Sequence, residues 1–139
     1  KNIIINVGSK DGIKAGMTVI AAEGLVGHII SVTDSTAKVQ TIIDSSSSTS
    51  SLISTSRDSI VCKGILNNDE QLKAMYIPTE ATVSQGDSIE TSGLGGIYPK
   101  GIYIGTVEKV ENTTDLTNRY ALVSVAVNFK KLETVLVIK

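Results

Sequence analysis

The chain has 139 residues, with 13 basic and 14 acidic side chains and a net charge of −1 at neutral pH. This length corresponds to one ordinary domain or two very small ones, and the balanced charge gives no electrostatic reason to expect a nucleic acid partner. A single cysteine and a single histidine exclude a disulfide framework and a Cys/His zinc site. We therefore expect no metal site and no cofactor.

Short strands are predicted along the whole chain, because isoleucine, valine and threonine make up a third of it. The clearest alternation of apolar and polar residues covers residues 120–129. Helical periodicity is nowhere sustained for the ~10 residues that a stable helix needs, and residues 129–132 form one helical turn at most. The other predicted strands cover residues 3–7, 18–21, 25–33, 37–43, 52–55, 60–66, 72–77, 88–91, 103–110 and 134–138.

The spacing of these strands predicts an all-β fold of two small, mostly antiparallel β-barrel-like units, packed together and with almost no helix. A pattern of glycine, strand, Gly-Leu turn, glycine and two further strands starts at Gly16 and starts again at Gly86. Such a pattern indicates two related units but also arises by chance in glycine-rich β sequences. We expect a division into residues 1–67 and 68–139, with terminal strands that are able to cross over between the units.

A run of hydroxyl residues covers positions 44–51 and reads Asp-Ser-Ser-Ser-Ser-Thr-Ser-Ser. Serine and threonine side chains compete for backbone hydrogen bonds and suit turns. We interpret this run as a mobile connecting loop.

A chymotrypsin-like serine hydrolase is the alternative function, because His28, Asp34 or Asp44, and Ser88 follow in the order of that catalytic triad. However, Ile and Glu follow Ser88, so its surroundings predict a strand without the backbone donors of an oxyanion hole. His28 also lies within a strand pattern, which argues against a catalytic role. Cys62, the single thiol, is expected in the core. A third class, direct binding of a glycan, would show as an exposed groove with stacking aromatic residues, and four tyrosines and one phenylalanine give little support for it.

Residues 93–101 form a glycine-rich segment that suits a rigid loop. Its glycines permit positive φ or close chain approach, and its proline keeps the preceding residue extended. The segment is interpreted as a tight barrel corner, as a loop that presents apolar anchors to a partner protein, or as both. The candidate partner-binding residues are Leu94, Ile97 and Tyr98, which are expected to be at least partly exposed, and the structural loop residues are Gly93, Gly95, Gly96, Pro99 and Gly101.

This segment also resembles a known family. Thr-Ser-Gly-Leu-Gly-Gly-Ile-Tyr-Pro-Lys-Gly-Ile-Tyr-Ile-Gly at residues 91–105 is similar to the signature of the MreC family of bacterial rod shape-determining proteins. Tyr98 stands where that family more often has phenylalanine. Further blocks at residues 6–19, 24–27 and 128–138, together with Asp44, follow in the order of the family.

The resemblance implies two small β-barrels in a non-enzymatic scaffold of the cell-elongation machinery, which maintains rod shape during peptidoglycan synthesis. It also implies self-association and the partners MreD, penicillin-binding protein 2, RodA and, across the membrane, MreB. The family domain lies at the extracytoplasmic face of the bacterial cytoplasmic membrane, anchored by an N-terminal transmembrane helix. Because this chain begins inside a predicted strand, we expect that anchor to lie in a missing N-terminal part.

Overall fold

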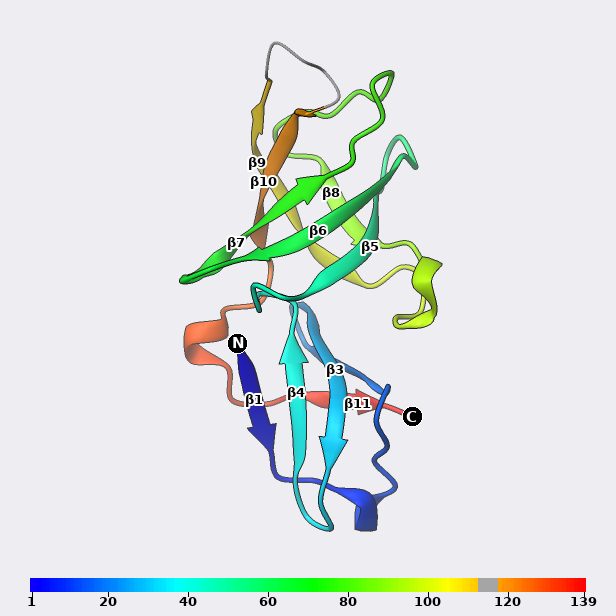
Figure 1. Cartoon of the computed structure of the whole chain (residues 1–139), viewed down its shortest axis with the longest axis vertical. Helices are drawn as coiled ribbons and strands as arrows, with labels where there is room; N and C mark the ends of the chain where they lie inside the picture. The colour runs from blue at the N-terminus through cyan, green and yellow to red at the C-terminus, as the bar shows by residue number, and fades with distance from the viewer. Residues whose placement is uncertain (113–117) are drawn as a thin grey trace.

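The computed structural model describes residues 1–112 and 118–139 and shows an almost entirely β protein. A five-stranded sheet and a closed six-stranded barrel are stacked along the long axis of the molecule (Figure 1). The predicted all-β fold of two antiparallel units is therefore confirmed. One unit closes into a barrel, whereas the other remains a sheet with two edges.

The sheet is built from both ends of the chain. Its strand order is β1-β4-β3-β2-β11, and every neighbouring pair is antiparallel. The C-terminal strand returns from the barrel and pairs with β2, with Val137 opposite Val19. The strands are β1 (Asn2–Ile5), β2 (Thr18–Ala21), β3 (Gly24–Val32), β4 (Ala37–Thr41) and β11 (Leu136–Ile138).

The barrel takes the middle of the chain. Its strands close in the order β10-β7-β6-β5-β8-β9, again with antiparallel neighbours. Closure leaves no free edge among these strands, which removes the usual site of edge-to-edge association. The strands are β5 (Ser48–Ile53), β6 (Ser59–Ile65), β7 (Asn68–Met75), β8 (Ser88–Thr91), β9 (Tyr103–Glu111) and β10 (Tyr120–Val125).

Short 3₁₀ turns are the helical elements among the described residues, and they include η1 (Ser9–Asp11), η2 (Leu94–Gly96) and η4 (Phe129–Lys131). The last one confirms the single helical turn predicted at residues 129–132. Asn128 caps it, because its side chain accepts a hydrogen bond from the Lys130 amide. Within residues 1–112 and 118–139, none of the helical segments has the length and apolar character needed to cross a membrane.

The two units share their packing at the seam. Leu25 and Ile42 come from the sheet portion of the chain, yet both are fully buried in the core cluster of the barrel. A second cluster around Val26 and Val39 fills the sheet unit. The backbone also approaches closely here: a Cβ atom at Gly24, where β3 begins, would lie 2.5 Å from the Tyr103 carbonyl oxygen of β9. Glycine is therefore required for the units to pack this tightly.

The strand pairing divides the chain at other points than residues 67 and 68. Leu66 and Asn67 are the two-residue turn between β6 and β7, which are neighbours in the same barrel. Asn67 has a φ of 59°, a left-handed conformation that asparagine tolerates. The turn-prone residues at this position therefore form a hairpin turn within the barrel and do not mark a boundary between units. The chain enters the barrel between β4 and β5 and leaves it after β10.

The interpretation of residues 44–51 as a connecting loop is wrong for its second half. Ser48 to Ser51 begin strand β5, which pairs with β6 on one side and β8 on the other. Thr49 and Ser51 face inward and are buried, and the Ser51 hydroxyl donates to the Thr49 carbonyl oxygen at 2.8 Å. Pairing with two neighbours therefore outweighs the turn preference of these hydroxyl residues.

Candidate interaction site

The glycine-rich loop, residues 93–101, connects β8 to β9 at the level of the seam (Figure 1). Thr91 closes the loop at its base: its hydroxyl donates to the Pro99 carbonyl oxygen at 2.6 Å and accepts from the Ile102 amide at 2.8 Å. The Gly101 amide also donates to the Thr91 carbonyl oxygen at 2.9 Å. These bonds hold both ends of the loop together and give it a fixed shape.

Positive φ angles explain the glycines of the loop. Gly93, Gly95, Gly96 and Gly101 have φ values of 79°, 82°, 74° and 91°, a region that side-chain-bearing residues rarely adopt. At Gly95 a Cβ atom would also lie 3.3 Å from the Ser50 hydroxyl of β5. The predicted structural role of these residues agrees with this geometry.

Tyr98 does not lie on the surface, so the expectation that it is exposed is wrong. Its side chain is only 8% exposed and belongs to the barrel core. Its hydroxyl group lies 2.9 Å from Nδ1 of His28, and the two rings meet edge to face with centroids 5.6 Å apart. Burial raises the pKa of Tyr98, so the phenol remains neutral and able to donate. The loop folds back because its one aromatic ring finds this partner on β3.

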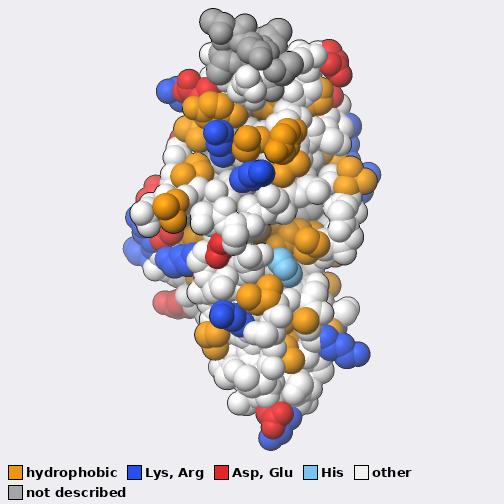
Figure 2. Space-filling view, in the orientation of Figure 1, with side chains coloured by type: hydrophobic (Ala, Val, Ile, Leu, Met, Phe, Trp, Pro, Cys, Tyr) orange, Lys and Arg blue, Asp and Glu red, His pale blue; other side chains and the backbone are white. Residues whose placement is uncertain are grey.

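Leu94 and Ile97 are exposed as expected, with exposed fractions of 62% and 45%. They lie on the rigid loop that Tyr98 fastens to the sheet. Figure 2 shows the single histidine at the narrow waist of the molecule, with hydrophobic side chains beside it. The loop therefore presents two apolar side chains in a fixed position at the junction of the two units.

The residues of the alternative hydrolase site are not assembled into a triad. His28 is bonded to Tyr98, and Ser88 lies in β8, opposite Thr106 of β9. Asp44 bonds instead to Ser46 and the amino group of Lys1. In the part of the chain that the structure describes, no group of three His, Cys, Asp or Glu side chains is placed to hold a metal ion.

Cys62 lies in the barrel core as expected and is fully buried. Burial raises the pKa of its thiol to about 11, although a hydrogen bond with Ser51 opposes the shift. The thiolate is the reactive form of cysteine, so this group is inert at neutral pH.

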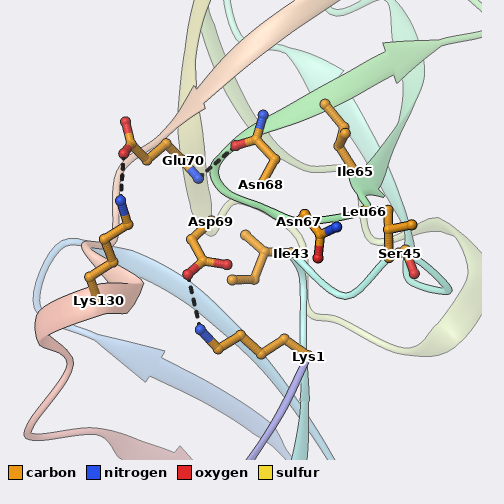
Figure 3. A pocket seen from close by; sticks show the side chains of 10 residues that line it. All are labelled: Lys1, Ile43, Ser45, Ile65, Leu66, Asn67, Asn68, Asp69, Glu70 and Lys130. Atoms are coloured by element: carbon orange, nitrogen blue, oxygen red, sulfur yellow. Dashed lines mark hydrogen bonds and ion pairs between the residues drawn. The ribbon is translucent and has the colours of Figure 1, made fainter.

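A cavity of about 630 Å³ opens at the seam between the Leu66–Asn67 turn and the sheet unit (Figure 3). Two ion pairs cross it: Lys130 with Glu70 at 3.0 Å, and the Lys1 side chain with Asp69 at 2.9 Å. The bond to Glu70 raises the pKa of Lys130. Both pairs are solvent-exposed and contribute little to stability. Most of the side chains that line the cavity are polar or charged, whereas small-molecule sites are lined mainly by hydrophobic and aromatic side chains.

Sequence reasoning missed one member of the loop site, namely His28. The sequence marks it only as a lone histidine among the apolar residues of a predicted strand. The pairing with Tyr98 joins positions 70 residues apart, and no local pattern encodes such a contact.

The chain is similar to proteins of one family. A family model described as "Rod shape-determining protein MreC, barrel core" matches residues 1–139. The cell shape-determining protein MreC of Haemophilus influenzae is 32% identical over 123 residues, which cover 88% of this chain and 34% of that protein. The chain spans about a third to a half of the length of the curated relatives it matches.

Solved structures show the same architecture. The crystal structure of MreC from Pseudomonas aeruginosa has a TM-score of 0.93 at 26% identity and covers 99% of this chain and 88% of that chain. A complex between penicillin-binding protein 2 and MreC from Helicobacter pylori has a TM-score of 0.69 at 21% identity, covering 86% of this chain and 74% of that chain. This second likeness establishes a shared fold.

Proposed function

Because the chain belongs to the MreC family of bacterial rod shape-determining proteins, we propose that it acts as a non-enzymatic scaffold of the cell-elongation machinery. The scaffold maintains rod shape by binding membrane-linked proteins of peptidoglycan synthesis. The observation that carries this proposal is the family match over residues 1–139. The engagement of His28 with Tyr98 supports it further, since the histidine is held in a structural contact.

Penicillin-binding protein 2 is the first partner in this proposal. MreC from Helicobacter pylori is described in a complex with it, and the fold shared with that protein is the support for extending the partner to this chain. MreD and RodA are further partners. MreB is reached through an N-terminal part that lies outside this chain, and that part carries the transmembrane anchor that places the domain at the extracytoplasmic face of the cytoplasmic membrane.

The glycine-rich loop is the proposed partner site, with Leu94 and Ile97 as its anchors. Rigid, exposed apolar side chains lose little conformational freedom on binding, which favours them as interface anchors. Tyr98 takes a different role from the one expected, because a buried ring cannot be contacted by a partner. It positions the loop through His28.

The test measures binding of the soluble domain of penicillin-binding protein 2 from the same organism, by calorimetry. Leu94→Asp should weaken binding at least tenfold, because it removes an apolar anchor and adds a charge. Leu66→Asp is the matched control: Leu66 is also an exposed loop leucine, at 73% exposed, on a different turn. Binding that is unchanged in Leu94→Asp would exclude the loop, and no binding by the unmodified chain would exclude this partner.

Self-association is proposed to use the edges of the sheet. Strands β1 and β11 each pair on one side within the sheet, and Ile4 and Leu136 on them are exposed. We expect the isolated chain to be monomeric or weakly dimeric at micromolar concentration. Light scattering over a concentration series measures this, and Ile4→Lys should remove any weak dimer. A tight dimer that is independent of concentration would contradict the proposal.

A further inference from the structure

The outer face of strands β6, β7 and β10 carries two lysines that lie directly opposite each other. Lys63 on β6 pairs in register with Lys73 on β7. Like charges placed directly opposite across antiparallel strands destabilise a sheet. Within residues 1–112 and 118–139, neither lysine forms an ion pair with an acidic side chain, whereas Lys109 nearby is bonded to Glu111 at 2.7 Å.

Each lysine lies over a tyrosine ring. The Lys63 ammonium group is 5.5 Å from the ring centroid of Tyr76, and that of Lys73 is 4.4 Å from the ring centroid of Tyr120. Tyr76 is 65% exposed. Attraction between an ammonium group and an aromatic face offsets part of the repulsion and holds both charges in place without neutralising them. The two cations are thus fixed on the surface and available to an anion.

A small cavity of about 100 Å³ lies within this face. Apolar residues lie beside the lysines on the same face. Val61 and Met75 are each two positions from a lysine along their strands and lie opposite each other, and Leu122 of β10 lies opposite Lys73. Figure 2 shows Lys and Arg side chains set among hydrophobic ones on the barrel half of the molecule. The cavity is lined by Lys73, Met75, Tyr76, Asn118, Arg119 and Tyr120.

We propose that this face, the Lys63–Lys73 face, binds an acidic segment of a partner protein. A carboxylate of the segment lies between the two ammonium groups, and an apolar side chain next to it enters the cavity, whose volume suits a single side chain. Charge complementarity selects the anion, since the repulsion between Lys63 and Lys73 is relieved when a carboxylate binds. The site is separate from the glycine-rich loop.

A protein segment fits this face better than a lipid surface does. Sites that recognise anionic membranes by charge gather four to eight basic residues. Lys109 beside this face is paired with Glu111, and Arg119 donates to the carbonyl oxygens of Pro78 and Ala81. Two cations, Lys63 and Lys73, therefore remain for an anion. The apolar strip around Met75 and Leu122 also gives an alternating acidic and apolar segment a matching surface.

The test uses a capped peptide of alternating glutamate and leucine and its glutamine counterpart, titrated into the ¹⁵N-labelled chain. Amide resonances of Lys63, Lys73, Tyr76 and Tyr120 should shift and saturate with the glutamate peptide, and the glutamine peptide should bind at least tenfold more weakly. Equal shifts with both peptides, shifts centred elsewhere, or no shifts at millimolar peptide would overturn the proposal. This titration uses only the unmodified chain, so its outcome does not depend on whether a variant folds.

Charge reversal sharpens the test. Lys63→Glu/Lys73→Glu should abolish binding of the glutamate peptide and create binding of the corresponding lysine peptide. Lys10→Glu/Lys14→Glu is the matched control, since it changes the net charge equally at exposed positions of the sheet unit. Leu94→Asp should leave peptide binding unchanged, which separates this site from the loop. Sedimentation with phosphatidylglycerol vesicles that depends on Lys63 and Lys73, without peptide binding, would replace the proposal with a membrane surface.

Discussion

The Nδ1 atom of His28 and the hydroxyl group of Tyr98 lie 2.9 Å apart and join strand β3 of the sheet to the glycine-rich loop of the barrel. With the imidazole proton on Nε2, the tyrosine donates and the histidine accepts. The contact fixes the loop relative to the sheet, so the position of Leu94 and Ile97 depends on a bond that neither of them makes.

Removing the hydroxyl group should destabilise the protein measurably. We expect Tyr98→Phe to lower the free energy of unfolding by about 1 kcal/mol, because the half-buried imidazole nitrogen loses its partner while the ring still packs. Urea denaturation measures the change. Tyr103→Phe is the control, since the Tyr103 hydroxyl bonds to the Thr106 hydroxyl at an exposed site. Equal losses of unfolding free energy in both variants would show that the buried hydrogen bond contributes no more to stability than the exposed one.

Stability should fall as the solution becomes acidic below neutrality. Burial lowers the pKa of His28 beneath its ordinary value of 6.5, so the folded state favours the neutral imidazole and the unfolded chain binds a proton more readily. The stabilisation is present above pH 6.5 and is lost as the pH falls through the lower folded-state pKa. His28 is the only histidine, so its ring proton resonances report that pKa directly. A folded-state pKa above 6.5 would reverse the sign, and His28→Gln should flatten the dependence.

Substitutions at Gly96 should follow the cost of a left-handed backbone. Gly96 has a φ of 74°, and no atom lies within 4 Å of a Cβ atom built there. Gly96→Val should therefore lower stability by about 1 to 2 kcal/mol through backbone strain alone. Gly96→Asn should cost clearly less, because asparagine tolerates this region. Thermal unfolding distinguishes the two, and equal costs would argue against a strained loop.

Cys62 should resist modification in the folded protein. Its thiol is fully buried and its pKa is raised to about 11, so Ellman's reagent at mildly alkaline pH should react only after unfolding. The reaction rate in increasing urea then follows the unfolded population. Rapid reaction under native conditions would mean that the barrel opens locally around β6.

Local sequence patterns predict the strands well because the alternation of side chains is a local property. Residues 18–21 and 88–91 were expected as strands and form β2 and β8 with those limits. The start of β5 was missed, since serine and threonine carry a turn preference that only the pairing with β6 and β8 overrides. Tertiary context decided that element.

The backbone of the candidate site and the exposure of Leu94 and Ile97 were predictable, whereas the burial of Tyr98 was not. The loop glycines were expected to allow either positive φ or close chain approach, and positive φ, a property of single residues, is what four of them show. The direction of Tyr98 depends on His28, 70 positions away, and the lysine pair on the register between β6 and β7. Partners in space are set by the whole fold, so spacing along the chain does not reveal them.

The return of β11 to the sheet determines how mechanical load passes through the domain. A pull applied at Asn2 and Ile138 acts on β1 and β11, which are the two edges of the same sheet. The tension crosses the sheet through its lateral hydrogen bonds, and the barrel, inserted between β4 and β11 in the chain, carries none while those bonds hold. The Lys63–Lys73 face and the glycine-rich loop therefore keep their shape under load until the hydrogen bonds between the strands of the sheet break.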